Sequence, residues 1–213
     1  MFLTPPPTHY YVILLRHGES IGNAEGIYQG QADYSLSDLG REQVTKLARR
    51  WQAAGTTFDQ IITSPLARAR QSADIISQFI KIPVVQDPLW MERDVGLISG
   101  LPPEEADKKY PRPAFMHPYY PAGVTGESQW ELFLRGGHAI QDLLKRPLGR
   151  YLIVSHGGIL NMVLYGILGI TPQANFTGPR FQFSNTGFAT LTYTPEEHAW
   201  RVIGINNNTH LHT

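Results

Sequence analysis

The sequence contains no cysteine among its 213 residues. Disulfides, thiolate metal sites and cysteine nucleophiles are therefore excluded, so any covalent catalysis must use another side chain. An excess of charge is also lacking, because 18 basic residues balance 18 acidic ones and the formal net charge is zero. A balanced chain has no global field that attracts nucleic acid or an acidic membrane surface, and we expect neither as a partner. Any binding of an anion must be local.

The sequence also lacks an uninterrupted apolar segment of the length that spans a membrane. Residues 151–170 have about the right length, but they include a serine, a histidine, an asparagine and four glycines. A buried strand, a turn and an apolar helix explain this segment better than a span. The N-terminus, MFLTPPPTHYY, has neither a basic segment nor a long apolar one, so it does not resemble a signal peptide. We expect residues 1–9 to form a mobile, proline-rich tail and the protein to be cytoplasmic.

Apolar segments with the length of buried strands alternate with segments of helical periodicity. The predicted strands cover residues 11–15, 60–63, 84–85 and 151–155, and the predicted helices cover about 37–55, 64–80 and 128–146. Residues 187–194 and 200–205 are typical of a hairpin. Strands that alternate with amphipathic helices indicate a sheet covered on both faces. We therefore predict an α/β fold, a three-layer α/β/α sandwich with a mostly parallel central sheet and an antiparallel C-terminal edge hairpin.

Helix starts and one irregular region complete the predicted organisation. Ser37 is expected to cap the first long helix, and Ser64, followed by Pro65, to start the second. The third helix offers four candidate buried positions: Trp130, Leu134, Ile140 and Leu144. Residues 101–126 contain six prolines without sustained periodicity, which predicts an irregular lid insertion. With no linker or repeat in a chain of this length, we predict a single domain over residues 10–213.

Three of the predicted strands end in residues that share a chemistry. The first leads into Arg16 and His17, the second into Ser64 and Arg68, and the fourth into His156. Ligands of an open α/β sheet bind beyond the carboxyl ends of its strands, where helix N-termini also point. If these strands are neighbours, two histidines and two arginines converge on one small volume. Such a set suits a tetrahedral dianion, because guanidinium groups donate paired hydrogen bonds that match phosphate.

The two histidines have simpler interpretations that must be weighed. Taken alone, a histidine behind a strand is more often structural than catalytic, so the convergence carries the argument. Neither His17 nor His156 has a carboxylate at ligand-like spacing, and nearby arginines repel a cation, so we expect no metal site. Like charge lowers the pKa of a histidine and favours its neutral, nucleophilic form. Asn23, six residues past His17, can add an amide donor.

The ordered motifs around these residues resemble the histidine phosphatase superfamily, the phosphoglycerate mutase-like proteins, and its phosphatase branch in particular. They span about residues 10–211. The matching segments are RHGESIGN at 16–23, QG at 29–30, LSDLG at 36–40, SPLARA at 64–69, MERDVG at 91–96 and VSHG at 154–157. The resemblance implies a phosphoglycerate mutase-like fold and phosphoryl transfer that requires no metal.

The resemblance also implies a role for each matching residue. His17 corresponds to the nucleophile that forms a phosphohistidine, and Glu92 to the acid that protonates the leaving oxygen and then activates water. Arg16, Arg68 and His156 complete the implied catalytic set. These three residues and Glu92 are also implied to contact the substrate. Supporting substrate contacts are implied for four further residues: Asn23, Gln29, Gly30 and Gly157. One position departs from the pattern, since Ser99 stands where many phosphatase-branch members have a glutamate. We interpret this as a mark of the subfamily rather than of the chemistry.

Three functions are compatible with these residues. The favoured one is a metal-independent phosphomonoesterase that acts through a phosphohistidine on a small phosphorylated metabolite and needs no cofactor. The alternative is a phosphoglycerate mutase that depends on 2,3-bisphosphoglycerate. Classical mutases of the family that the chain resembles have a longer stretch between the acidic element and the second histidine, with a pair of adjacent arginines. Here that stretch is shorter, and Arg112 stands alone, with only Lys108, Lys109 and Arg135 to assist. A non-catalytic phospho-ligand-binding or regulatory protein is the third, although no member of the catalytic set is missing. We expect the lid at 101–126 to select the alcohol by shape and stacking, and the oligomeric state is not predicted.

Overall fold

The computed structural model describes residues 8–212, so most of the expected N-terminal tail lies outside the described residues. Its strands are β1 (Tyr10–Arg16), β2 (Gln60–Thr63), β3 (Val84–Gln86), β4 (Arg150–Ser155), β5 (Phe188–Thr194) and β6 (Ala199–Asn207). Its α-helices are α1 (Ile21–Ala24), α2 (Asp38–Ala53), α3 (Ala67–Ile80), α4 (Pro103–Lys109), α5 (Gln129–Leu143) and α6 (Gly157–Leu168). Short 3-10 helices occur at η1 (Pro88–Trp90), η2 (Gly96–Ile98), η3 (Ala174–Phe176), η4 (Pro195–Glu197) and η5 (Thr209–Leu211).

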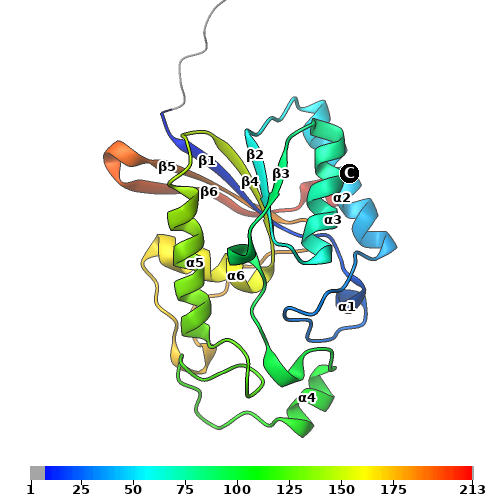
Figure 1. Ribbon diagram of the computed structural model, residues 1–213, viewed down its shortest axis with the longest axis vertical. Coiled ribbons are helices and arrows are strands. Elements are labelled where there is room, and N and C mark those ends of the chain that lie inside the picture. Colours follow the sequence, from blue (N-terminus) through cyan, green and yellow to red (C-terminus); the bar gives the residue numbers. More distant parts are fainter. Residues whose placement is uncertain (1–7, 213) are drawn as a thin grey trace, which may run out of the picture.

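The sheet has six strands in the order β3-β2-β4-β1-β5-β6. The pairs β2–β3, β2–β4 and β1–β4 are parallel, while β1–β5 and β5–β6 are antiparallel. Helices α2 and α3 cover one face of the sheet and α5 and α6 cover the other (Figure 1). The predicted three-layer α/β/α arrangement, with its antiparallel hairpin at one edge, is confirmed.

The alternating side chains of the strands build two cores. In β1, Val12 and Leu14 face the core under α5 and α6, whereas Ile13 and Leu15 face the core under α2 and α3. All four are buried, and burial of such a side chain stabilises the fold by about 1.5–3 kcal/mol. A strand anchored on both faces fixes the position of whatever follows it, which here is Arg16 and the site.

Two predicted helices differ from the observed ones. Ser37 caps α2 as predicted, but α3 begins at Ala67 rather than at Ser64. Its first amide, Ala67 N–H, donates to the Asp33 carboxylate at 2.6 Å, so a distant loop supplies the cap and Ser64 is free for another role. In α5, the prediction was wrong for Leu134, whose side chain is 47% exposed. The buried stripe of α5 runs instead through Leu132, Gly136, Ala139 and Leu143.

The lid is not wholly irregular, because it contains α4. Proline at the first helical position, two glutamates in the first turn and two lysines in the last turn all favour a short helix there. The remainder of residues 101–126 is loop, as predicted. In Figure 1 this region lies below the sheet, on the same side as α1.

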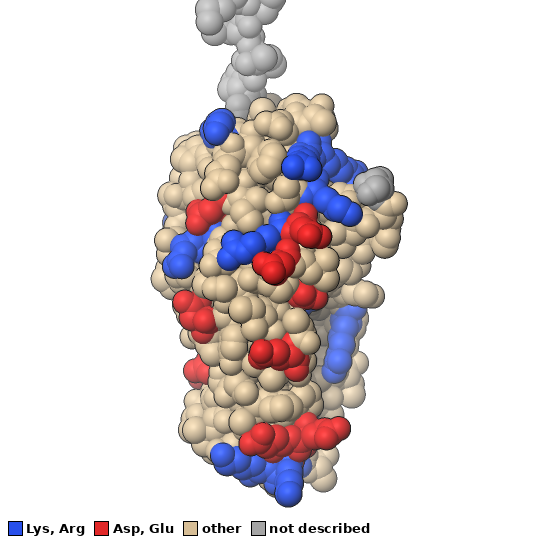
Figure 2. All heavy atoms as spheres, turned by 90° about the vertical axis from the view of Figure 1, so that its right-hand side faces the viewer, with Lys and Arg blue, Asp and Glu red and all other residues tan. Residues whose placement is uncertain are grey.

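Charged side chains of both signs are interspersed on the face shown in Figure 2. This fits the balanced composition, and that face offers no extended patch of one sign. None of the helices within residues 8–212 is long and apolar enough to cross a membrane.

Candidate active site

The carboxyl ends of three neighbouring strands bring the site residues together. Strand β4 lies between β1 and β2, with Arg16 of β1 paired to Ser155 and Thr63 of β2 paired to Val154. The His17 N–H donates to the Ser155 carbonyl at 3.0 Å, which continues the ladder by one residue. As a result the imidazole rings of His17 and His156 lie with their centroids 5.0 Å apart.

His17 is held in one tautomer. Its Nδ1 lies 2.6 Å from the Gly18 carbonyl oxygen, and since a carbonyl only accepts, Nδ1 carries the proton. The unprotonated nitrogen is therefore Nε2, which retains its lone pair. Burial, followed by the Arg68 and Arg16 guanidinium groups, holds the pKa of His17 well below its ordinary value. A neutral imidazole with a free Nε2 is the form that can attack phosphorus.

Arg16 has a donor that the protein leaves unused. Its Nη1 donates to the Phe183 carbonyl at 2.7 Å, while its Nε is buried and has no hydrogen-bond partner among the described residues. Burial lowers the pKa of Arg16, and the Glu92 carboxylate opposes this effect. A buried, unpaired guanidinium N–H is costly unless a ligand completes it, and the donor type fits an anionic oxygen.

His156 and Arg68 form one hydrogen-bonded unit with Ser64. Arg68 Nε donates to His156 Nδ1 at 3.2 Å, so His156 Nε2 carries the proton and donates to Ser64 Oγ at 2.8 Å. This contact explains why Ser64 does not cap α3. Burial, then His17, Arg68 and Arg16, hold the pKa of His156 well below its ordinary value, so it too is neutral at neutral pH.

Arg68 is also tied to the loop that precedes α2. Its Nη1 donates to the Ala32 carbonyl at 2.9 Å and its Nη2 to the Gly30 carbonyl at 2.7 Å. Because a guanidinium has five N–H donors, two of them remain for a ligand. Arg68 is 1% exposed and therefore rigid, which suits a group that must hold an anion in place.

The Glu92 carboxylate sits at the N-terminus of α6. Its Oε2 accepts from Gly158 N–H at 3.1 Å, and its Oε1 accepts from Ile159 N–H at 3.2 Å and Arg93 N–H at 2.9 Å. A carboxylate stabilises a helix N-terminus, so Glu92 has a structural role besides any chemistry. Its charge also acts on Arg16 and Arg68, which places it beside the anion site.

The remaining residues implied by the resemblance surround this centre. Asn23 Oδ1 accepts from Ser20 in the capping box of α1, and Gln29 Oε1 accepts from Ser20 Oγ at 2.7 Å. The Gly30 carbonyl accepts the hydrogen bond from Arg68 Nη2 that is described above. Gly157 begins α6, and a Cβ there would lie 4.0 Å from Arg16 Nε, so its backbone borders the unused donor. The structure thus gathers all the implied residues, and it gives Asn23, Gln29 and Gly30 bonds that support the loop.

Ser99, the position at which the motif pattern departed from expectation, holds the same loop. Its hydroxyl donates to the Gln29 carbonyl at 2.9 Å. Ser99 therefore anchors the backbone next to Gly30, whose carbonyl accepts a hydrogen bond from Arg68 Nη2.

Sequence reasoning missed the residue that positions Glu92. Arg135 forms a two-point contact with Glu127, at 2.8 and 2.7 Å, and donates to the backbone carbonyls of Leu89, Met91 and Glu92. It fixes the backbone that carries the carboxylate. The sequence does not show that Arg135 lies on the face of α5 that packs against η1, so it predicted for Arg135 only a possible part in substrate binding.

A second missed group lies behind His17. Thr186 N–H donates to the carbonyls of Arg16 and His17, and Asn185 Nδ2 donates to the His17 carbonyl at 3.2 Å. Thr186 Oγ1 in turn contacts Nε2 of the buried His210 at 2.8 Å. The sequence of this segment, NNNTHL at residues 206–211, does not indicate the contact.

Fold and site together define an α/β protein with an anion site of paired histidines and arginines at the carboxyl edge of its sheet. The chain belongs to the histidine phosphatase superfamily, since the model of its branch 1 matches residues 12–208. The resemblance of the sequence motifs to this family is confirmed. An "Uncharacterized phosphatase PhoE" of Bacillus subtilis is 30% identical over 94% of this chain and 96% of that protein. A "Probable phosphoglycerate mutase GpmB" of Yersinia enterocolitica is 33% identical over 91% of this chain and 88% of its own length.

Several solved structures with the same fold carry phosphatase names. A phosphoserine phosphatase of Entamoeba histolytica, mutated and in complex with phosphoserine, has a TM-score of 0.75 at 26% identity, covering 95% of this chain and 99% of that chain. A mycobacterial glucosyl-3-phosphoglycerate phosphatase in complex with VO3 has a TM-score of 0.76 at 25% identity, covering 92% and 98%. The family and its relatives place the chain among phosphatase or mutase enzymes.

Proposed function

We propose that the protein is a phosphomonoesterase that works through a phosphohistidine on His17 and needs neither a metal nor an organic cofactor. The observation that carries the proposal is that one site holds both an unprotonated nitrogen, His17 Nε2, and an unused buried donor, Arg16 Nε. A nucleophilic nitrogen that carries no proton and a guanidinium with an unused N–H donor suit a dianionic phosphoryl group. Its substrate is then a small phosphoester.

In the first step, His17 Nε2 attacks phosphorus in line with the ester oxygen, the P–N bond forms and the P–O bond breaks. Arg16, Arg68 and the α6 backbone stabilise the charge on the equatorial oxygens. Glu92, in its acid form, delivers a proton to the leaving alcohol. His156 holds Arg68 in register through the bond to its Nε.

In the second step, the Glu92 carboxylate takes a proton from water as that water attacks the phosphohistidine. The P–N bond breaks, inorganic phosphate forms and His17 returns to its neutral state. The rigid attachment of Glu92 to α6 and to the backbone held by Arg135 supports both transfers, because a proton donor must lie within hydrogen-bond reach.

The test is release of phosphate from p-nitrophenyl phosphate in the presence of excess EDTA. We expect turnover, inhibition by vanadate, and a loss of about 10⁴-fold or more in His17→Ala. His138→Ala is the matched control, because this exposed histidine on α5 lies outside the site. Quenching in base should trap radiolabelled phosphate on the wild-type protein and not on His17→Ala. Turnover that survives in His17→Ala would refute the proposal.

The relatives named as probable phosphoglycerate mutases favour one second candidate. In a mutase the phosphohistidine passes its phosphoryl group back to a second hydroxyl instead of to water. Against this candidate, Arg135 is occupied by Glu127 and three carbonyls, and Arg112 pairs with Asp107 at 3.4 Å. Conversion of 3-phosphoglycerate to its 2-isomer, stimulated by 2,3-bisphosphoglycerate and faster than hydrolysis, would establish the mutase instead.

A further inference from the structure

The peptide group between Gly18 and Glu19 is held at both of its polar atoms. Its carbonyl oxygen, on Gly18, accepts from His17 Nδ1 at 2.6 Å, and its N–H, on Glu19, donates to Gln43 Oε1 at 2.9 Å. Only the amide oxygen of a glutamine side chain can accept such a bond, so the orientation of the Gln43 amide is fixed. Because a peptide group is planar, the bond to Gln43 also fixes the direction of the carbonyl that His17 uses.

Gln43 belongs to α2, a helix that supplies none of the site residues described above. It lies in the second turn of α2, next to Val44, which is buried in the core under α2 and α3. Gln43 itself is partly exposed. A glutamine at such a position is usually solvated, yet its amide oxygen contacts the backbone of the loop that follows β1. The packing of α2 on the core therefore reaches the nucleophile through this one side chain.

The start of α2 and the loop after His17 are in close contact. Ser37 N–H donates to the Glu19 carbonyl at 2.9 Å, and the Ser37 hydroxyl donates to the Glu19 carboxylate at 2.7 Å. A Cβ on Gly18 would lie 2.6 Å from the Gly40 carbonyl oxygen, and a Cβ on Gly40 would overlap the Glu19 carbonyl. The two glycines thus permit an approach of the two backbones that brings Glu19 N–H within reach of Gln43.

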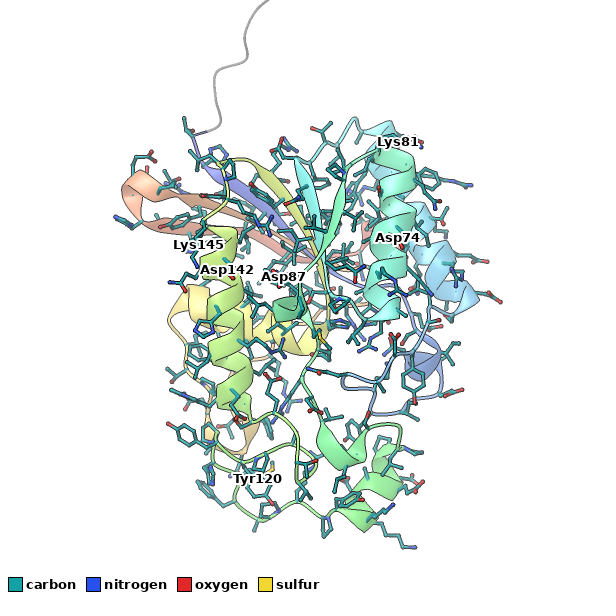
Figure 3. All side chains as sticks on the ribbon, viewed as in Figure 1. Asp74, Lys81, Asp87, Tyr120, Asp142 and Lys145 are labelled. Carbon is teal, nitrogen blue, oxygen red and sulfur yellow. The ribbon has the colours of Figure 1, made fainter. Side chains whose placement is uncertain are left out.

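A different helix holds the preceding peptide group. Gly18 N–H donates to Ser72 Oγ of α3 at 3.1 Å, and this buried hydroxyl donates to the Arg68 carbonyl one turn earlier at 2.7 Å. Figure 3 labels Asp74 partway along α3 and Lys81 at its C-terminal end, so the half of α3 that carries Ser72 lies toward the carboxyl edge of the sheet. The following peptide, held by α2, is the one whose carbonyl orients the nucleophile.

We propose that Gln43 is a positioning residue for the nucleophile, which through the Gly18–Glu19 peptide keeps the proton of His17 on Nδ1 and directs Nε2 at the phosphoryl group. This inference rests on the proposed role of His17. Gln43 touches neither the substrate nor the reacting atoms. Without its acceptor the peptide can turn, Nδ1 loses its fixed partner, and the ring can carry its proton on Nε2, a form that cannot attack phosphorus.

The test replaces Gln43 by methionine, which has a similar length and helix propensity but accepts hydrogen bonds only weakly. With p-nitrophenyl phosphate, kcat/KM should fall about tenfold or more, because misplacement of a reacting group by about 1 Å costs about 10²-fold. Inhibition by inorganic phosphate should stay within about twofold of wild type, since the arginines that bind it are unchanged. Gln43→Glu keeps an acceptor oxygen at the same reach and should stay within about threefold of wild type in kcat/KM.

Gln52→Met is the matched control. Gln52 lies near the C-terminal end of the same helix and also bonds a backbone group, because its Nε2 donates to the Phe79 carbonyl at 2.9 Å. This variant should keep the kcat/KM of wild type, and urea unfolding compares the stability of the two methionine variants. If Gln43→Met does not fold, Gln43→Asn takes its place in the comparison, since its amide is one methylene too short to reach Glu19 N–H.

The ¹⁵N NMR spectrum of the histidine rings is a readout that does not depend on activity. The signals of His17 are those lost in His17→Ala. In the wild type they should show one tautomer, protonated at Nδ1. In Gln43→Met the tautomer protonated at Nε2 should appear at about a tenth of the intensity or more, because the loss of one hydrogen bond shifts such an equilibrium by about tenfold. Gln52→Met should give the wild-type signals.

The outcomes separate the two proposals. If the wild type hydrolyses no phosphoester, the hydrolase function fails, while the tautomer of His17 in Gln43→Met still decides whether Gln43 positions this ring. A folded Gln43→Met that keeps the single wild-type tautomer overturns the inference, whatever its activity. When the ester is hydrolysed, equal kcat/KM in Gln43→Met and Gln52→Met would also overturn it, and so would a loss in Gln43→Glu as large as that in Gln43→Met.

Discussion

Replacement of Gly158 by alanine is the sharpest test of the role of Glu92. Gly158 lies in the first turn of α6, and a Cβ there would lie 3.1 Å from Glu92 Cδ and 3.5 Å from Oε2, with Oε1 closer still. Nonbonded heavy atoms prefer separations of about 3.5–4.0 Å, so the carboxylate has to move by about 1 Å. The Gly158 and Ile159 hydrogen bonds that aim it would lengthen at the same time.

The expected effect depends on the leaving group. A misplacement of about 1 Å costs about 10²-fold when a group must be positioned for reaction, and general acid catalysis contributes about 10²–10⁴-fold. We therefore expect kcat/KM of Gly158→Ala to fall about 10²-fold with benzyl phosphate, whose alkoxide needs a proton. With p-nitrophenyl phosphate, whose phenolate leaves unaided, the fall should stay within about fivefold.

Gly166→Ala on the same helix is the control. Gly166 is exposed, and a Cβ there would contact only Phe133 Cε2, at 4.0 Å. This variant should keep both activities and gain up to about 1 kcal/mol of stability, because alanine favours helix. Steady-state kinetics with both substrates and urea unfolding of both variants complete the assay. If Gly158→Ala loses equal activity on the two substrates, or none on benzyl phosphate, Glu92 is not the acid.

The layers of the fold could be predicted because the strands are short and apolar and the helices carry regular stripes. The errors occurred where tertiary contacts override local signals. Ser64 has the residue type and the following proline of a helix start, yet Asp33, 34 residues before Ala67, caps α3 while Ser64 bonds His156. In α5, Trp130 packs against Tyr119 of the lid, with ring centroids 5.2 Å apart, while Leu134 is exposed, and no local pattern shows either fact.

The candidate site followed from motifs, but its internal bonds did not. The positions of His17, Arg68 and His156 behind strands were readable, because parallel strands end at one edge. The tautomer of His17 depends on a backbone carbonyl, and Arg68 uses its bonds to hold His156 and a loop as well as a ligand. Which partner each donor of a side chain finds depends on the tertiary structure. The sequence could therefore indicate the pocket but not the hydrogen bonds within it.

Three further perturbations follow from the same geometry. Arg16→Lys removes the unused Nε donor but keeps the charge, so vanadate inhibition should weaken roughly 10–100-fold, and unchanged inhibition would show that Nε does not contact the phosphoryl group. Because burial and the arginines keep His17 neutral, kcat/KM should decrease on acidification only at a pH well below 6.5. A decrease that begins at or above pH 6.5 would contradict the neutral state assigned to His17. The last concerns His210, which is 1% exposed and whose pKa burial lowers from 6.5 to about 4. Above pH 6.5 it is neutral both folded and unfolded, whereas between pH 6.5 and 4 only the unfolded chain takes up the proton, so stability falls as the pH falls. Between pH 7 and 4.5 this group removes about 2 kcal/mol from the free energy of unfolding. His17 and His156 act in the same direction, so the measurement is the difference between wild type and His210→Gln in urea unfolding at the two pH values. The variant should lose less stability on acidification, and because Thr186 bonds the His17 carbonyl, an equal loss in both proteins would mean that His210 is not the buried neutral support of that segment.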